Sequence, residues 1–475
     1  MTRTDGDQHF ELAIIGGGSA GFAAAIRAAE EGARVALINS GTIGGTCVNV
    51  GCIPSKALIR AAEANHRRAH HPFDGIARTA GTDVDWTAVL SQKDHLVGQL
   101  RQGKYVEVLE SYPTVSLFEQ RARIEPGGGV RLDDDTLISA PRVIVTTGAA
   151  PLIPEIPGLS EADYLDSTSA MALSDLPSSM IVLGAGSVGL ELAQAFARFG
   201  VEVTILSRSP HILSKADSDV GTGLMGHLRQ EGIAIHAGLD IAKIEKDGDD
   251  HVVHFESREG RAASVRANQL LVALGRRPNT TGLGLEEAGV TLGSAGEIVV
   301  DEFLKTSNPQ VYAAGDVTGT PMYVYVAAQD AARASVNALH GNTEAMDRRV
   351  VPQVVFTDPA VALVGLSAEE ASAQGIEAIT ALLPLDNVPR SLAAQDTRGF
   401  IKLVADSETR KIIGAQILAS EAGDMIMEPA LAVKFGLTIT DLTSTLHPYL
   451  TLAEGIKLAA LTFDKDVAKL SCCAA

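Results

Sequence analysis

Two stretches of the chain repeat the same order of apolar and polar positions. Each begins with an apolar run typical of a buried strand, passes through a glycine-rich turn into an alanine-rich helix, and ends in a second apolar strand. The two sequences are ELAIIGGGSAGFAAAIRAAEEGARVALIN and MIVLGAGSVGLELAQAFARFGVEVTILSR, with Gly32 and Gly200 near the helix ends. Because the complete strand, turn, helix and strand unit occurs twice, the pattern predicts two nucleotide-binding units of α/β type.

The segments between and after these patterns indicate how the units are connected. A polar helical stretch runs from about Ala57 to Tyr112, strand-like segments end in VIVTTGAAP, and after VALGRRPNT the chain resumes with TSNPQVYAAGDV. We therefore expect the second unit to be inserted into the first. From about Val351 strands and helices alternate without a nucleotide motif, which is typical of an assembly domain, and the apolar run from Ile456 to Phe463 has helical spacing.

Composition narrows the class of protein. The 475 residues fit about three domains, and 46% of them are hydrophobic, which is enough for a sizeable core. Charged residues interrupt the apolar runs before the ~20 residues that a membrane span needs, and the N-terminus lacks the pattern of a signal peptide. We therefore expect a cytoplasmic protein without a transmembrane helix. A net charge of −19 argues against nucleic acid as a partner.

The first glycine turn predicts a site for the diphosphate of a dinucleotide. Gly16, Gly18 and Gly21 allow the tight turn, the close approach of a pyrophosphate to the backbone, and the packing of helix on strand. The second strand of such a unit usually ends in an acidic residue that binds a ribose hydroxyl. Asn39 stands at that place, and its amide can still form a hydrogen bond to a hydroxyl, without charge.

The second glycine turn predicts a site for a phosphorylated nicotinamide cofactor. Its second strand ends in Ser207 and Arg208, where a carboxylate would select NADH. A cation at this place suits a 2′-phosphate, so the sequence favours NADPH, and Lys215 is either a further contact or a solvated lysine. The glycines of this turn are Gly184, Gly186 and Gly189.

The four cysteines form two pairs, and each pair predicts thiol chemistry. Cys47 and Cys52 lie in GGTCVNVGCIPSK, which we interpret as a short loop leading into a helix whose N-terminus lowers a thiol pKa. Cys472 and Cys473 are adjacent, so their Cα atoms lie ~3.8 Å apart, less than the ~4.4 to 6.8 Å of a comfortable disulfide. The tail pair is therefore better suited to bind a soft, thiophilic metal ion.

The motifs GGTCVNVGCIPSK, ALGRRPN and YAAGDV, together with both glycine turns, resemble the FAD-dependent pyridine nucleotide:disulfide oxidoreductases along essentially the whole chain. The resemblance implies an α/β fold with two Rossmann-like domains, the second inserted in the first, and an α+β dimerisation domain. It assigns residues 1–150 and 278–350 to FAD binding, 151–277 to NADPH binding, 351–463 to dimerisation and 464–475 to a mobile tail.

The same resemblance implies roles for individual residues. Cys47 would be the thiol that meets the substrate and Cys52 the thiol beside the flavin, while Lys56 and Glu191 match the charged pair that the family places near the flavin ring. Asp316 would contact the ribityl or phosphate part of FAD. Further positions expected to contact the cofactors are Gly45, Thr46, Thr147, Gly148 and Gly275.

Within that family the C-terminal segment PYLTLAEGIKLAALTFDKDVAKLSCCAA, with FTDPAVALVG, LDNVPRSLAAQDTRGFIKLV and GKY, resembles the mercuric reductases. This resemblance implies NADPH-dependent reduction of Hg(II) to Hg(0) in a homodimer whose active site is shared between subunits. Hg(II) would arrive as a thiol complex, bind to Cys472 and Cys473 and pass to Cys47 and Cys52. The source of Hg(II) is left open, with a separate mercury carrier protein as one alternative.

The resemblance also implies roles for two tyrosines and a prediction about the N-terminus. Tyr105 and Tyr449, which the residues alone would place in the core or on the surface, match tyrosines around the bound metal. The N-terminal metal-binding domain of many mercuric reductases is not expected, because the first strand begins about ten residues from Met1.

The histidines bear on the alternative functions of this chain. Disulfide-reducing relatives carry a catalytic histidine at the position of His447, backed by a glutamate five residues later, where this chain has Leu452, with Glu454 two residues beyond. We therefore expect His447 to be noncatalytic, which argues against a large-type thioredoxin reductase or a dihydrolipoamide dehydrogenase. A metal-sequestering flavoprotein is a nonenzymatic alternative. The cluster of His66, Arg67, Arg68, His70 and His71 predicts a solvated face rather than a metal site.

Overall fold

The computed structural model describes residues 9–79, 84–319, 321–466 and 469. These residues form two compact units, and each is made from separate segments of the chain. Unit 1 comprises Met1–Ala57, Thr87–Leu152 and Gly275–Asp347, and unit 2 comprises Leu58–Trp86, Ile153–Leu274 and Arg348–Ala475.

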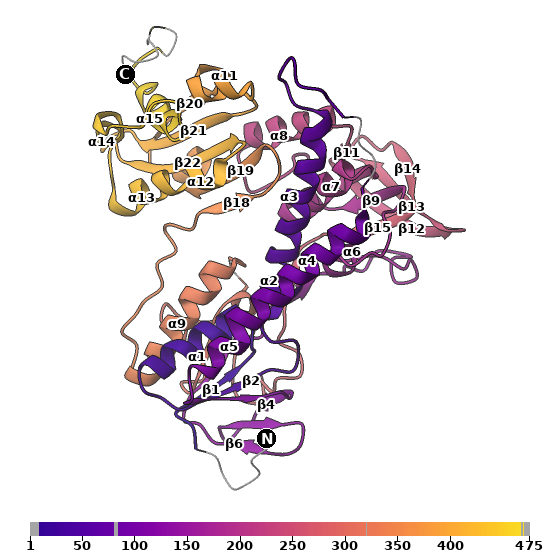
Figure 1. The fold of residues 1–475 in the computed structure, drawn as a ribbon. Coiled ribbons are helices and arrows are strands. Elements are labelled where there is room, and N and C mark those ends of the chain that lie inside the picture. Colours follow the sequence, from indigo (N-terminus) through magenta and orange to yellow (C-terminus); the bar gives the residue numbers. More distant parts are fainter. Residues whose placement is uncertain (1–8, 80–83, 320, 467–468, 470–475) are drawn as a thin grey trace. The chain divides into compact units, whose positions relative to one another are not determined.

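Unit 1 is built on a five-stranded parallel sheet with the strand order β17-β7-β1-β2-β3. Strands β1 and β2 are buried along their whole length, as their continuous apolar sequences predict. Helices α1 and α9 lie side by side in Figure 1 and share one apolar core. Its elements are β1 (Leu12–Ile15), α1 (Ser19–Glu30), β2 (Val35–Ile38), α2 (Gly45–Val50), α4 (Trp86–Arg101), η1 (Gln102–Val106), α5 (Glu107–Glu110), β3 (Val115–Phe118), β4 (Ala122–Ile124), β5 (Val130–Leu132), β6 (Leu137–Ile138), β7 (Val143–Val145), β8 (Ala149–Pro151), β16 (Arg276–Pro278), β17 (Val311–Ala313), η2 (Asp316–Thr318) and α9 (Val324–His340).

Strand β17 shows how the chain returns to this sheet. It follows the second glycine pattern in the sequence, yet it pairs in parallel with β7, which precedes that pattern. The pairing joins Val311 to Val143 and Ala313 to Val145. The same sheet is therefore formed by segments on both sides of the second nucleotide-binding pattern.

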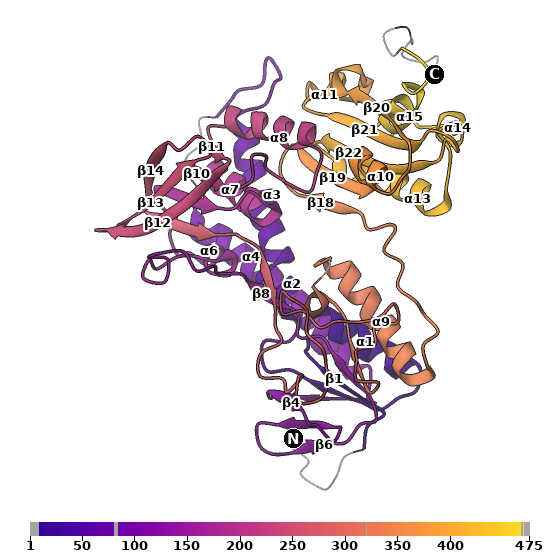
Figure 2. The ribbon, with the colours of Figure 1, turned by 180° about the vertical axis from the view of Figure 1, so that it is seen from behind.

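Unit 2 contains a four-stranded parallel sheet, β11-β10-β9-β15, and Figure 2 shows the antiparallel strands β12, β13 and β14 next to it. Helix α3 (Cys52–Ala69) begins in unit 1 and continues into unit 2. The elements of this part are α6 (Ser167–Ala170), β9 (Ser179–Leu183), α7 (Ser187–Arg198), β10 (Glu202–Ser207), α8 (Ser218–Gln230), β11 (Ala234–Ala237), β12 (Leu239–Asp247), β13 (Asp250–Ser257), β14 (Ala262–Ala267) and β15 (Gln269–Val272).

The C-terminal part of unit 2 is an antiparallel sheet, β18-β19-β22-β21-β20, covered by helices. The predicted helix over residues 456–463 is confirmed as α15 at Glu454–Leu461. Ser367 caps α10 through a reciprocal hydrogen-bond pair with Glu370, which fixes where that helix begins. The elements are β18 (Gln353–Val355), β19 (Ala360–Gly365), α10 (Ala368–Ala373), β20 (Ala378–Pro384), η3 (Leu385–Asn387), α11 (Pro389–Ala394), β21 (Phe400–Asp406), β22 (Ile412–Ala419), α12 (Ala422–Met425), α13 (Met427–Phe435), α14 (Ile439–Ser444) and α15.

Within the described ranges, none of the helices combines the length and apolar character that a membrane crossing requires.

Candidate active site

The first glycine turn is held by contacts that leave no room for side chains. Gly16 has φ +118°, and a Cβ on Gly21 would lie 1.8 Å from the carbonyl oxygen of Gly16. Gly18 precedes α1 as its N-cap residue, so the first free N–H groups of the helix follow the turn directly. The turn therefore fits the diphosphate of a dinucleotide, since bare backbone and a helix N-terminus face the same place.

The second glycine turn in unit 2 has the same construction. Gly184 has φ +109°, and a Cβ on Gly189 would lie 2.2 Å from the carbonyl oxygen of Gly184. Gly186 is the N-cap residue of α7, and a Cβ there would meet nothing within 4 Å. This open space beside a helix N-terminus fits a second phosphate group.

Asn39 follows β2 and contacts the first glycine turn directly. Its Oδ1 accepts a hydrogen bond from the N–H of Gly17 at 3.1 Å, and its Nδ2 donates to the carbonyl oxygen of Gly41. The Asn39 amide therefore connects the end of β2 to the first glycine turn. Its expected contact with a ribose stays a prediction.

The segment that carries the redox cysteines is helical, which corrects the short loop expected from the sequence. Cys47 lies inside α2, and Cys52 is the first residue of α3, with Gly51 between the two helices. Gly44 adopts a left-handed conformation at φ +93°, and this allows α2 to begin immediately after the turn. The two cysteines therefore lie on two successive helices that are separated by one residue, not on a loop.

The pKa of the Cys47 thiol is raised, not lowered as expected. The causes are its side-chain hydrogen bond with Cys52, burial, and the negative charge of a Cys52 thiolate, whereas Lys56 lowers it. Because one proton is shared between two close sulfurs, the first deprotonation disfavours the second. The pair therefore carries one thiolate more readily than two.

Tyr105 lies beside this cysteine pair in unit 1. Its hydroxyl forms a hydrogen bond of 3.1 Å with the hydroxyl of Ser19, and its ring packs edge-on against Phe22 with centroids 4.7 Å apart. Burial raises the pKa of Tyr105, and the charges of Cys47 and Cys52 raise it further, which places the phenol in the electrostatic reach of both sulfurs. The structure thus brings together three of the residues predicted for catalysis.

Tyr105 is positioned by a π-helical turn. The segment Gln102–Val106 has π-helical hydrogen bonds and interrupts the helix that would otherwise run from α4 into α5. Such turns shift the direction of the side chains that follow and are frequent at functional sites. No pattern in the amino-acid sequence predicts this insertion.

Asp316 begins η2, after the strand β17, and burial raises the pKa of its carboxyl while the positive charge of Arg276 lowers it. Thr147 donates to the carbonyl oxygen of Asn279 at 2.6 Å, and Gly148 accepts from the N–H of the same residue at 2.9 Å. The remaining predicted cofactor contacts of unit 1 are Gly45, whose Cβ would lie 2.6 Å from the Cα of Gly18, exposed Thr46, and Gly275 with φ +120°.

In unit 2, Ser207 ends β10 and is buried, and Arg208 follows it and is exposed. Among the described residues, neither Arg208 nor Lys215 has a carboxylate partner within ion-pair distance. Glu191 is buried in α7 and accepts a hydrogen bond from the N–H of Phe356 at 3.0 Å. Its expected pairing with Lys56, which lies in unit 1, stays a prediction.

The expectation that His447 lacks an acidic partner is wrong. Its Nε2 lies 2.7 Å from Oε1 of Glu428 in α13, and its Nδ1 lies 3.0 Å from the carbonyl oxygen of Thr445. Glu454, the nearest later acid, accepts from the N–H of Leu450 instead. Because both partners of the ring are acceptors, only a protonated imidazole donates to both at once. Glu428 precedes His447 by 19 residues, so no local spacing could reveal the pair.

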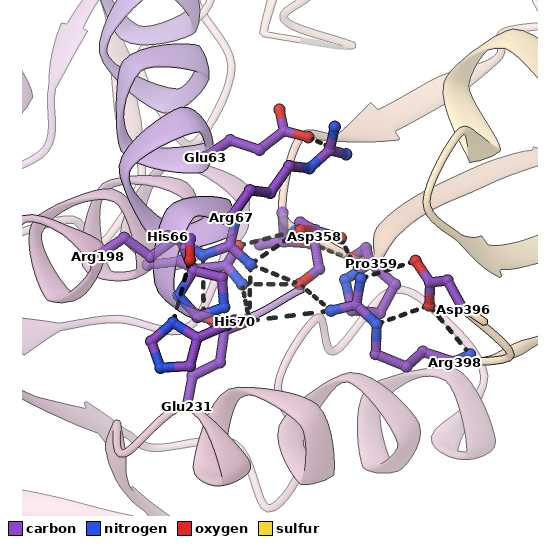
Figure 3. A network of polar contacts seen from close by, with 12 residues as sticks. Glu63, His66, Arg67, His70, Arg198, Glu231, Asp358, Pro359, Asp396 and Arg398 are labelled. Carbon is purple, nitrogen blue, oxygen red and sulfur yellow. Dashed lines mark hydrogen bonds and ion pairs between the residues drawn. The ribbon is translucent and has the colours of Figure 1, made fainter. Parts of the chain in front are cut away.

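The histidine cluster at the end of α3 and just after it is only partly the solvated face expected. His66 is half-buried and stacks on His70 at 4.2 Å, and burial together with Arg198 lowers the pKa of His66 to about 4. Figure 3 shows both rings beside the ion pairs of Arg198, Glu231 and Asp358. No three His, Cys, Asp or Glu side chains within the described parts of the chain are grouped to hold a metal ion.

Three further residues predicted for catalysis are Tyr449, Cys472 and Cys473. Tyr449 is half-exposed in unit 2, close to the exposed Leu446 and Leu450. Cys472 and Cys473 lie outside the described residues.

Comparison with known proteins defines the class. The pyridine nucleotide-disulphide oxidoreductase family matches residues 10–331, and the dimerisation domain of this family matches residues 351–460. The chain belongs to this family of oxidoreductases, which use a flavin and a pyridine nucleotide. The fold class and enzyme class expected from the sequence are confirmed.

Within the family, the chain is similar to the mercuric reductases along nearly its whole length. It is 45% identical to the mercuric reductase of Streptomyces lividans over 98% of both chains, and 45% identical to that of Bacillus cereus over 99% of this chain and 74% of that protein. The resemblance seen in the sequence is thereby confirmed.

Solved structures support the same fold. The HOCl-induced flavoprotein disulfide reductase RclA of Escherichia coli, solved as a Cu(II) complex, is 29% identical with a TM-score of 0.86, over 96% of this chain and all of that one. LpdA of Mycobacterium tuberculosis is 29% identical with a TM-score of 0.84, over 96% of this chain and 99% of that one.

Proposed function

We propose that this protein catalyses the NADPH-dependent reduction of Hg(II) to Hg(0). The observation that carries the proposal is the 45% identity to mercuric reductases over nearly the whole chain. The Cys47 and Cys52 pair supports it, because two sulfur ligands suit a soft metal ion, and Tyr105 lies beside that pair.

The cofactors of the proposal are FAD and NADPH. Gly16, Gly18, Gly21 and Asn39 would hold the FAD diphosphate and ribose, and Asp316 would face the middle of that cofactor. Glycines 184, 186 and 189 would hold the NADPH diphosphate, and the exposed Arg208 would bind the 2′-phosphate. When bound, the flavin supplies two-electron transfer from the nicotinamide to the cysteine pair and the metal.

Thiolate exchange describes how the cysteines would handle the substrate. Hg(II) would arrive as a complex with two thiols, exchange onto Cys472 and Cys473 of the tail, and then onto Cys47 and Cys52 of the partner subunit's site. Each transfer forms one Hg–S bond and breaks another, so the free ion is never released. The raised pKa of Cys47 means that its proton leaves as the metal binds.

The overall reaction balances without further reactants. NADPH gives two electrons and Hg(II) accepts both, which yields NADP⁺, Hg(0) and a proton. Hg(0) carries no charge to hold thiolate ligands, so it leaves the sulfurs. We place this reaction in the cytoplasm, where NADPH is available, in a homodimer that receives Hg(II)–thiol complexes directly or from a carrier protein.

Purified yellow protein tests the proposal. With excess low-molecular-weight thiol, HgCl₂ should start oxidation of NADPH and release volatile mercury in a 1:1 ratio. Replacement of both tail cysteines, Cys472→Ala with Cys473→Ala, should slow this turnover. Absence of mercury-dependent oxidation would contradict the proposed function, and tight mercury binding without oxidation would instead identify a sequestering flavoprotein.

A second candidate, a disulfide reductase, is favoured by the His447–Glu428 pair. In disulfide-reducing relatives a histidine with an acidic partner transfers protons to the leaving thiol. Rapid NADPH oxidation with lipoamide or thioredoxin, but not with Hg(II), would support this alternative. Glu428→Gln should then abolish disulfide reduction, whereas mercury reduction should change little, since metal release requires no such proton transfer.

A further inference from the structure

Asn49 lies between the two redox cysteines, and its side chain is fixed on three sides. Its Nδ2 donates to the carbonyl oxygens of Ile43 and Gly45, both at 2.9 Å, and its Oδ1 accepts from Nη1 of Arg101 at 3.1 Å. A flipped amide would set its oxygen against two carbonyl oxygens and its NH₂ against a guanidinium. The orientation is therefore determined by its partners.

Arg101 connects this amide to the helix that carries Tyr105. It is the last residue of α4 and the N-cap residue of the π-helical turn, and Tyr105 follows four positions later. The ring of Tyr105 packs against the same segment, because a Cβ on Gly44 would lie 3.3 Å from its Cδ2. The helix thus meets the cysteine-bearing segment through one polar contact and one apolar contact.

The polar contact is the directional one of the two. Packing of an apolar ring on a glycine backbone has little directional preference, whereas a hydrogen bond from a guanidinium weakens steeply with distance and angle. Ser19 and Phe22 hold the Tyr105 side chain against α1, and the Arg101 contact fixes its helix against the cysteine-bearing segment. The π-helical turn at Gln102–Val106 interrupts the regular hydrogen bonding of the helix, so a contact at its start helps to define the direction in which Tyr105 leaves the helix. Arg101 supplies that contact at the residue where the turn begins.

We propose that Arg101 and Asn49 are positioning residues that fix the phenol of Tyr105 relative to the thiols of Cys47 and Cys52. Neither residue touches the substrate in this inference; Arg101 acts through Tyr105. The inference rests on the proposed function for its kinetic effect, but the placement of Tyr105 can be measured without mercury.

The kinetic test is a double-mutant cycle in the purified holoenzyme. Arg101→Met keeps the aliphatic stem and removes the hydrogen bond, and we expect kcat for mercury-dependent NADPH oxidation to fall ~10-fold with KM changed less than ~3-fold. Tyr105→Phe should have a similar effect. The double variant should be no slower than Tyr105→Phe alone, because Arg101 acts through the phenol. Arg101→Lys should recover part of kcat.

Controls separate positioning from general destabilisation. Arg27→Met removes a helix-surface arginine of α1 that pairs with Glu31, and it should leave kcat unchanged. If Arg101→Met and Tyr105→Phe multiply in the double variant, or if either alone leaves kcat unchanged, the inference is wrong.

A mercury-free measurement distinguishes this inference from the proposed function. In the NADPH-reduced protein, Arg101→Met and Tyr105→Phe should each change the rate of Cys47 alkylation by iodoacetamide at least ~3-fold, and Arg27→Met should not. A wild-type protein inactive with Hg(II) would overturn the proposed function, yet altered alkylation would still support the positioning role. Equal alkylation rates in all variants would overturn the positioning role itself.

Discussion

Single glycines decide whether the two nucleotide sites can form. Gly21 and Gly189 each face the carbonyl oxygen of a glycine five residues earlier, at distances where no Cβ fits. The same contact in both units explains why the spacing of the two sequence patterns is identical. The constraint is steric and local, so it could be read from the sequence.

Gly189→Ala should impair nucleotide binding without affecting the flavin. A Cβ 2.2 Å from the oxygen of Gly184 must displace the start of α7, and we expect KM for NADPH to rise at least ~10-fold while flavin content stays constant. Steady-state kinetics and the flavin absorbance of the purified protein measure both.

Gly226→Ala provides the matched control for this prediction. Gly226 lies in the exposed face of α8, and a Cβ there meets nothing within 4 Å. KM should stay within ~2-fold, and stability should rise by roughly 0.5–1 kcal/mol, because alanine restricts the unfolded chain. An equal rise of KM in both variants would contradict the steric explanation.

Other residue contacts could not be predicted, because their partners are distant in the sequence. The cysteine spacing identified Cys47 and Cys52, but the hydroxyl pair of Ser19 and Tyr105 joins residues 86 positions apart. The acidic partner of His447 lies on another helix and precedes it. Asn49 could have been noticed, since it stands between the two cysteines, but its Arg101 contact could not.

At the scale of elements, the apolar periodicity predicted the strands and long helices well. The cysteine segment differs from the predicted short loop, because the left-handed Gly44 allows α2 to begin directly after the turn and Gly51 separates it from α3. The sequence also did not predict that the ends of α3, α7 and α8 contact one another. Buried ion pairs join Arg198 at the end of α7 to Glu231 after α8 and to Asp358 (Figure 3), and α3 is joined to Arg198 by a hydrogen bond from Asn65 to its carbonyl oxygen.

Arg198 is the central residue of these ion pairs. It ends α7, is almost completely buried, and contacts Glu231 at 2.7 Å and Asp358 at 2.9 Å. Arg198→Met should lower the free energy of unfolding, but by less than the roughly 3–5 kcal/mol expected for an uncompensated buried charge. Arg398 still lies 2.7 Å from Asp358 and 4.0 Å from Glu231 in the absence of Arg198. Arg266→Met, which breaks exposed ion pairs on β14, should destabilise the protein far less, because water screens these charges. Urea unfolding of both variants, followed by far-UV circular dichroism, compares them.

The depressed pKa of His66 predicts a pH dependence of stability. Its pKa is about 4 in the folded protein against 6.5 for the unperturbed group, so the unfolded chain binds more protons between these values. Stability should therefore fall as the pH drops from about 6.5 towards 4. His66→Gln should make this loss of stability smaller by roughly 1–2 kcal/mol. This amount is less than the full pKa difference would give, because solvent screens the partly exposed ring.

Urea midpoints at pH 4.5, 5.5 and 7.5 measure that difference. His340→Gln, a substitution of an exposed histidine at the end of α9, should leave the slope unchanged. If wild type and His66→Gln lose stability in parallel over this range, another group is responsible.

At the scale of the whole molecule, the C-terminal part of unit 2 presents an apolar surface. Leu446 is 91% exposed and Phe435 67%, and Leu431 and Leu450 are also exposed. These residues lie in the segment that matches the dimerisation domain of the family. Their exposure in a single chain is consistent with burial against a second copy.

Leu446→Lys should weaken that association. A charged side chain in a symmetric apolar interface is buried twice per dimer, so we expect the dissociation constant of the dimer to rise at least ~100-fold. Analytical ultracentrifugation over a range of concentrations measures it. Val299→Lys, at an exposed apolar position of unit 1, should leave the dimer intact. A dimer unaffected by Leu446→Lys would place the interface elsewhere.

The π-helical turn at Gln102–Val106 makes chain length itself a determinant of the active site. An α-helix closes its turns with one residue fewer, so deletion of Gly103 would let α4 continue into α5 without interruption. Tyr105 would then rotate by about 100° around the helix axis, although every side chain of the site would still be encoded. Insertions and deletions in this segment should therefore be tolerated less well during evolution than many substitutions. A sequence alignment that places a one-residue gap outside this turn would assign the wrong residue to the position of Tyr105.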